Sequence, residues 1–92
     1  MHDRLTRLED ITEVLARSPL AKSGGVTVDE LAMDAALADL LFEKKAALEN
    51  RKNACLDKSV NSVTYNELLM SVAETVAGIR GFEFKYDVQL MV

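Results

Sequence analysis

VDELAMDAALADLLFEKKAALENRKNACL, residues 28–56, is the stretch that decides the fold class, because it contains neither glycine nor proline. A capping-box pattern precedes it: the hydroxyl of Thr27 can accept a hydrogen bond from the backbone N–H of Glu30, whose side chain can return one. We therefore predict one helix over about 28–56. A helix of about 28 residues is about 42 Å long, which exceeds the width of a small domain.

Apolar side chains surround the first half of this predicted helix, and a helix that is apolar on all sides is normally buried on all sides. The other helices of so short a chain cover two of its flanks, so we predict that a second polypeptide covers the third. The alternative is a monomer, because the alanines between the large side chains tolerate exposure. The predicted interface residues in this helix are Leu31, Leu37, Leu40, Leu41 and Phe42.

Two further helices follow from similar patterns. Helical spacing of apolar residues predicts a helix over about 3–17, which ends before Pro19. A second capping-box pattern, Thr64 to Glu67, predicts a helix over about 65–79. We expect residues 18–26 to be a flexible loop and residues 1–92 to form a single small helical domain.

The C-terminal segment, residues 81–92, alternates apolar and polar residues, which is the period of a half-buried β-strand. We predict a strand over about 82–91. The rest of the chain offers it no adequate partner, so the strand is expected to pair between chains. The alternative is that the tail prolongs the third helix, because Ile79, Phe82, Tyr86 and Leu90 also fit helical spacing. The predicted interface residues in the strand are Phe82, Phe84, Tyr86, Val88 and Leu90.

Charge is segregated along the predicted helix over 28–56. Residues 27–43 carry acidic side chains and no Lys or Arg, whereas residues 44–58 carry mostly basic ones. Compensation of the helix macrodipole explains this order. An antiparallel pair of these helices about a two-fold axis, acidic half against basic half, also explains it, and both can hold. The net charge of −4 argues against direct binding of nucleic acid, which normally needs a basic surface.

No catalytic, cofactor or metal site is predicted. The carboxylates of the long helix point in different directions, so they do not converge on one ion, and we expect a solvated face. His2 and Cys55 are the only histidine and cysteine; His2 lies at the terminus, and Cys55 is expected to pack as a small hydrophobe. Met33, Met70 and Met91 are expected to fill the core. The carboxylates in question are Asp29, Glu30, Asp34, Asp39 and Glu43.

The sequence thus predicts a mainly α protein with a C-terminal strand and a function in binding. We expect a small interaction or assembly protein, not an enzyme, that associates with itself or with a larger protein. The single cysteine, the charged first ten residues and the lack of a long apolar run favour the cytoplasm and no membrane partner. One alternative is an accessory subunit of an enzyme whose active site another chain completes. A weaker one is an acidic inhibitor of a nucleic-acid-binding surface.

Overall fold

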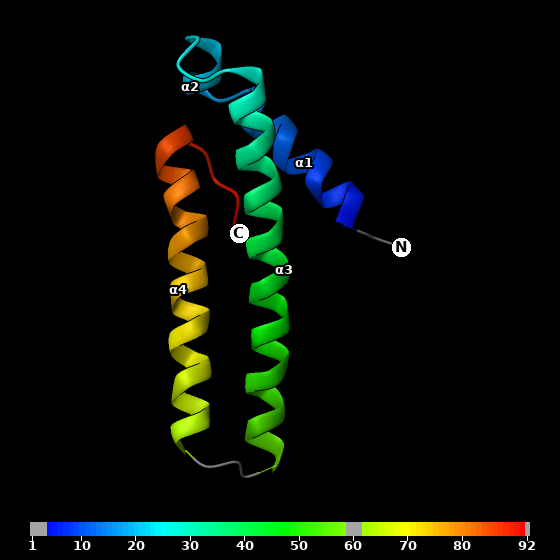
Figure 1. The fold of residues 1–92 in the computed structure, drawn as a ribbon, viewed down its shortest axis with the longest axis vertical. Coiled ribbons are helices and arrows are strands. Elements are labelled where there is room, and N and C mark those ends of the chain that lie inside the picture. Colours follow the sequence, from blue (N-terminus) through cyan, green and yellow to red (C-terminus); the bar gives the residue numbers. More distant parts are fainter. Residues whose placement is uncertain (1–3, 59–61, 92) are drawn as a thin grey trace.

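Two long antiparallel helices dominate the computed structural model, which describes residues 4–58 and 62–91 (Figure 1). They are α3 (Val28–Lys58) and α4 (Ser62–Tyr86), and together they form a helical hairpin. Helix α1 (Arg4–Ala16) crosses α3 near its start, on the side away from α4, and the short helix α2 (Pro19–Lys22) follows it. The molecule is elongated, with principal extents of 50 × 28 × 21 Å.

The start of α3 is set by Thr27. Its hydroxyl accepts a hydrogen bond from the N–H of Glu30 at 3.0 Å, and its carbonyl accepts one from the N–H of Leu31 at 2.9 Å. These bonds satisfy donors that a helix N-terminus otherwise leaves unpaired. The side chain of Glu30 turns away from the cap toward Lys85, so only half of the predicted capping box forms within the described residues.

The segment between α1 and α3 contains a helical turn within the residues predicted to be a loop. Ser18 caps α2 by accepting from the N–H of Ala21 at 3.2 Å, and Pro19 occupies the first helical position, where its missing N–H costs nothing. Gly24 has a φ of 78°, which favours glycine. A Cβ atom on Gly25 would lie 2.5 Å from Cδ1 of Leu20 and 3.3 Å from the Leu20 carbonyl oxygen, so the Leu20 side chain would have to move for a larger residue.

The strand predicted over 82–91 is wrong. The part of the chain that the structure describes contains no strand, and α4 continues to Tyr86. Ile79 and Tyr86, seven residues apart, are both fully buried, whereas Phe84 is 91% exposed. Helical spacing therefore overrides the two-residue alternation. The predicted start of this helix is also corrected: α4 begins at Ser62, so Thr64 lies inside the helix and is not its cap.

Helix α4 ends in a left-handed turn at Asp87, whose φ is 58°. The N–H of Val88 donates to the carbonyl of Glu83 at 3.0 Å, which is the six-to-one bond of a Schellman motif. The tail then turns back between α3 and α4 (Figure 1). The Glu83 carboxylate accepts from the N–H groups of Leu90 at 2.6 Å and Met91 at 2.8 Å, so the chain itself supplies partners for its terminal backbone.

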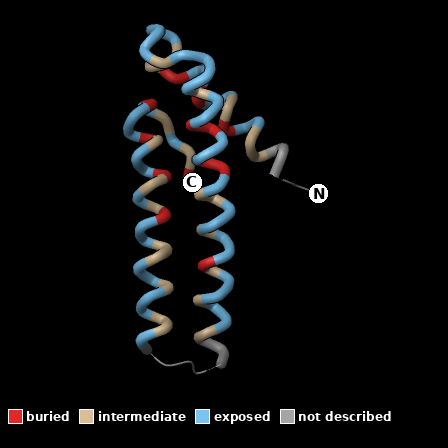
Figure 2. The backbone as a smooth tube through the Cα atoms, viewed as in Figure 1, coloured by how far each residue is buried: buried red, intermediate tan, exposed pale blue. Residues whose placement is uncertain are grey.

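The core lies at one end of the hairpin, where α1, α2, the start of α3, the end of α4 and the tail meet. Figure 2 shows buried positions gathered there, while the opposite end is mostly exposed. Its buried centre consists of Ile11, Leu15, Ala35, Ala38 and Tyr86. Around it pack Leu8, Leu20, Val26, Leu31, Phe42, Phe82, Val88 and Leu90.

Candidate functional site

One side of α3 carries large apolar side chains that the described part of the chain covers only in part. Met33 is 66%, Leu37 47% and Leu40 51% exposed, and Ala36 between them is exposed too. Their spacing of three and four residues makes them neighbours on one side of the helix. Helices α1 and α4 pack against other sides of α3. We call Met33, Ala36, Leu37 and Leu40 the α3 face.

The same side of α3 changes character farther along the helix. With the same three- and four-residue spacing it continues through Lys44, Ala47, Arg51 and Ala54, all of them exposed. Neither Lys44 nor Arg51 makes an ion pair within the described residues. This continuation carries no large apolar side chain. Its exposure to solvent is therefore less unfavourable than that of the α3 face.

The predicted interface residues divide into two groups. Leu37, Leu40 and Phe84 are exposed. The other residues are at least partly buried in the chain's own core or between α3 and α4, and Tyr86 is completely buried. Met33 is predicted in the core, but it lies on the α3 face. Its position seven residues before Leu40, about two helical turns, could have indicated that both residues lie on the same side of the helix. The inward-facing group comprises Leu31, Leu41, Phe42, Phe82, Tyr86, Val88 and Leu90.

A second exposed apolar line follows α4. Val63, Met70, Ala77 and Phe84 recur at seven-residue intervals, and all of them are exposed. Met70, like Met33, was expected in the core and lies outside it. Seven residues correspond to about two helical turns, or about 10 Å along the axis, so these side chains are not adjacent. This line is therefore sparser than the α3 face.

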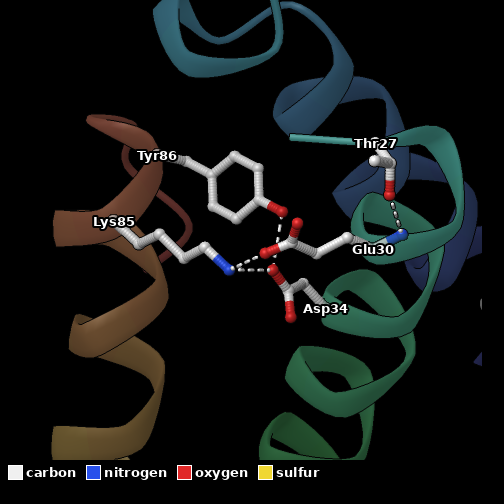
Figure 3. Close-up of polar contacts among 5 residues, drawn as sticks. All are labelled: Thr27, Glu30, Asp34, Lys85 and Tyr86. Atoms are coloured by element: carbon white, nitrogen blue, oxygen red, sulfur yellow. Dashed lines mark hydrogen bonds and ion pairs between the residues drawn. The ribbon is translucent and has the colours of Figure 1, made fainter. Parts of the chain in front are cut away.

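A partly buried polar network joins the start of α3 to the end of α4 (Figure 3). The phenol of Tyr86 donates to Oδ2 of Asp34 at 2.6 Å, and Nζ of Lys85 donates to the same oxygen at 2.7 Å. Lys85 also donates to Oε2 of Glu30 at 2.9 Å. Asp34 is buried, and its charge is compensated by the lysine and satisfied by both donors, as a buried carboxylate requires.

The network changes the acid–base properties of its members. Burial, with the hydrogen bond to Asp34 and its charge, raises the pKa of Tyr86 from its ordinary 10.0 to about 12. Hydrogen bonds to Asp34 and Glu30 raise the pKa of Lys85, which is therefore charged at all physiological pH values. The neutral phenol of Tyr86 and the cation of Lys85 both bind the Asp34 carboxylate, so the network holds the end of α4 against the start of α3. Neither the Tyr86 phenol nor the Lys85 ammonium therefore exchanges a proton near neutral pH.

Two other carboxylates are buried and bonded in the same manner. Asp39 accepts from Nε of Arg7 in α1 at 2.7 Å, and Glu83 accepts from Nη1 of Arg80 at 2.8 Å besides its two backbone donors. Burial alone would raise the pKa of Glu83, but the bonds from Met91, Arg80 and Leu90 outweigh it and lower the pKa. The expectation of a solvated acidic face is therefore wrong for Asp34 and Asp39, whose partners lie far away in sequence.

Two surface cavities are lined in part by the C-terminal tail. The larger, of about 410 Å³, is lined by Phe42, Val76, Leu90 and Met91 and by two cations, both of which form ion pairs. Lys45 pairs with Glu49 and Arg80 pairs with Glu83. A smaller cavity of about 230 Å³ lies between α1 and the tail. Within residues 4–58 and 62–91, no group of three metal-ligating side chains comes together. Cys55 is half-buried, and His2 lies outside the described residues.

No helix in the described part of the chain is both long and apolar enough to cross a membrane. Comparisons with protein-family models, curated proteins and solved structures gave no match.

Proposed function

We propose that this chain is a small interaction or assembly protein, acting as a homo-oligomer or as a subunit of a complex, and that it binds another polypeptide through the α3 face. The contact is expected in the cytoplasm, because a single cysteine is typical of reducing compartments. A binding role needs a surface whose exposure is unfavourable until a partner covers it. The exposed apolar side chains of the α3 face support this role.

The observation that carries the proposal is the contrast along one side of α3. Both halves of this side face away from α1 and α4, yet one half carries Met33, Leu37 and Leu40 while the other carries Lys44 and Arg51. Single apolar side chains are common on protein surfaces, but three large ones at neighbouring helical positions form a continuous apolar patch, which favours contact with another polypeptide. An occupant that covers the first half and leaves the second in water explains the difference.

Photo-crosslinking in the cells that make the protein tests the proposal without assuming a partner. A photoreactive phenylalanine analogue is introduced at Leu37, which is exposed, so the fold tolerates it. We expect a discrete crosslinked product whose mass identifies the occupant. The matched control places the same analogue at Glu9, an exposed position on α1, where no discrete product is expected.

Three outcomes are distinguishable. A product of twice the chain mass identifies a second copy, and a discrete product of any other mass identifies a different protein. No product at Leu37, or equal products at Leu37 and Glu9, contradicts the proposed function.

A further inference from the structure

We infer that the occupant of the α3 face is a second copy of this chain, docked antiparallel about a two-fold axis that passes between Ala36 and Leu37 of each copy. The inference rests on the proposed function and specifies the partner and its register. In this arrangement Met33 of one copy lies level with Leu40 of the other, and Ala36 lies level with Leu37. Each pairing occurs twice, as a two-fold axis requires.

The apolar residues fit this register. Met33, Leu37 and Leu40 are the large exposed side chains on this side of α3, and the register stacks all of them from both copies into one cluster. Ala36 is small, so it leaves room for Leu37 of the second copy at the axis. Large side chains opposite small ones let two helices approach closely and exclude water.

The charges at the ends of the cluster fit the same register. Asp29 lies one helical turn before Met33, and Lys44 lies one turn after Leu40. Both are exposed, and neither makes an ion pair within the described residues. The axis between Ala36 and Leu37 brings Asp29 of each copy level with Lys44 of the other. An opposite-charge pair therefore closes each end of the apolar cluster.

Other arrangements of two α3 helices fit less well. A parallel pair in register places Lys44 against Lys44 and Asp29 against Asp29, which is repulsive. An antiparallel pair with its axis between Glu43 and Lys44 sets Leu40 against Ala47 and Met33 against Ala54, so these two side chains cover only methyl groups, and Leu37 lies level with the polar Asn50. Unlike these two arrangements, the proposed register unites the apolar residues and pairs the charges.

Directed disulfide formation tests the register. In a Cys55→Ser background, Met33→Cys and Leu40→Cys chains are prepared separately, mixed and oxidised. We expect the mixed 33–40 disulfide to exceed both self-linked products. Met33 of one copy lies about 10 Å along the axis from Met33 of the other in this register, whereas a disulfide needs Cα atoms within about 7 Å. A Leu40→Cys plus Ala47→Cys mixture is the matched control and is expected to link poorly.

The outcomes separate the inference from the proposed function. Predominant Met33→Cys self-links indicate a parallel pair, and predominant 40–47 links indicate the longer antiparallel register; either overturns the inference while the α3 face remains a docking surface. A photo-crosslink from Leu37 to a protein of different mass also overturns the inference alone. Absence of any product in both experiments overturns both.

Charge exchange gives an independent check that uses exposed residues only. Asp29→Lys and Lys44→Asp are each expected to weaken dimerisation about tenfold, because each converts two attractive pairs per dimer into repulsive ones. The double variant restores the pairs in reverse and is expected to recover most of the affinity. Glu9→Lys on α1 controls for the change in net charge. If the double variant is weaker than both single variants, Asp29 and Lys44 do not face each other.

Discussion

The two halves of the helical hairpin differ in what covers α3. In the half that begins at Val28, α1 and the tail pack on one side, α4 packs on another, and buried carboxylates bond to Arg7, Tyr86 and Lys85. In the far half, α4 accompanies α3, and among the residues whose burial is described there, Leu48 is the buried apolar residue that α3 contributes. The buried core and the α3 face therefore lie in the same half, and the far half is a two-helix extension.

The largest expected difference between the halves concerns their cores. Leu15→Ala, in the buried cluster, is expected to lower the free energy of unfolding by about 2–5 kcal/mol, the usual cost of a large cavity in a core. Leu48→Ala in the far half is expected to cost no more than about 2 kcal/mol, since exposed neighbours can move into the space. Denaturant titration followed by circular dichroism measures both values. Equal costs would mean that the far half contributes as much to the fold as the core.

Next in size is the hydroxyl of Tyr86. Tyr86→Phe removes one donor to the buried Asp34 carboxylate, so we expect a loss of about 1–3 kcal/mol. Tyr65→Phe in the far half is the matched control and is expected to be neutral, because Tyr65 makes no hydrogen bond within the described residues. A neutral Tyr86→Phe variant would show that Lys85 alone suffices for Asp34.

The pH dependence sharpens this test. The pKa of Tyr86 rises on folding from 10.0 to about 12, so the stability that its neutral phenol supplies is complete below pH 10 and is lost as the pH rises through about 12. The difference in unfolding free energy between the wild type and Tyr86→Phe should therefore shrink across this window. A constant difference would contradict the bond to Asp34.

A smaller effect is expected at Glu83, which holds the tail. Glu83→Gln keeps an acceptor but loses the charge, so we expect a cost of about 1 kcal/mol at neutral pH. Folding lowers the pKa of Glu83 from 4.5, so this contribution is present above pH 4.5 and is lost as the pH falls below it. Stability of the wild type and of Glu83→Gln should converge in acid. Exposed Glu74→Gln is the control, with no effect expected.

The smallest effect is expected at Asp87. Its positive φ is unfavourable for residues with a Cβ atom, so Asp87→Gly should stabilise the protein, by less than about 1 kcal/mol. Thermal unfolding measures the change. A destabilised variant would show that the Asp87 side chain contributes more than the turn costs it.

Features with local causes could be predicted from the sequence. The uninterrupted stretch 28–56 is a helix, and Thr27 caps it. The spacing of Leu37 and Leu40 places both on one side of this helix, and both are exposed. The physical reason is that capping and helical periodicity depend on residues a few positions apart.

Features with distant causes could not be predicted. Tyr86 bonds to Asp34 across 52 residues, and neither spacing nor composition reveals that partnership. The strand prediction is wrong for the same reason. The C-terminal segment fits both the helical period and the two-residue period of a strand, and the burial of Ile79 and Tyr86 in the folded chain selects the helix. Asp34 is expected on a solvated face because charge runs usually face water, whereas its bonding partners Lys85 and Tyr86 come from the distant end of α4.

Sedimentation velocity of two aspartate variants tests the central claim most directly. Leu40→Asp places a charge on the α3 face, and Ala47→Asp places the same charge on the same side of the far half; both positions are exposed, so the fold should tolerate either. The wild type and Ala47→Asp are expected to sediment as dimers at micromolar concentration. Leu40→Asp is expected to sediment as a monomer with unchanged helical circular dichroism. A dimeric Leu40→Asp variant, or a wild type that remains monomeric, would contradict docking of a second copy on the α3 face.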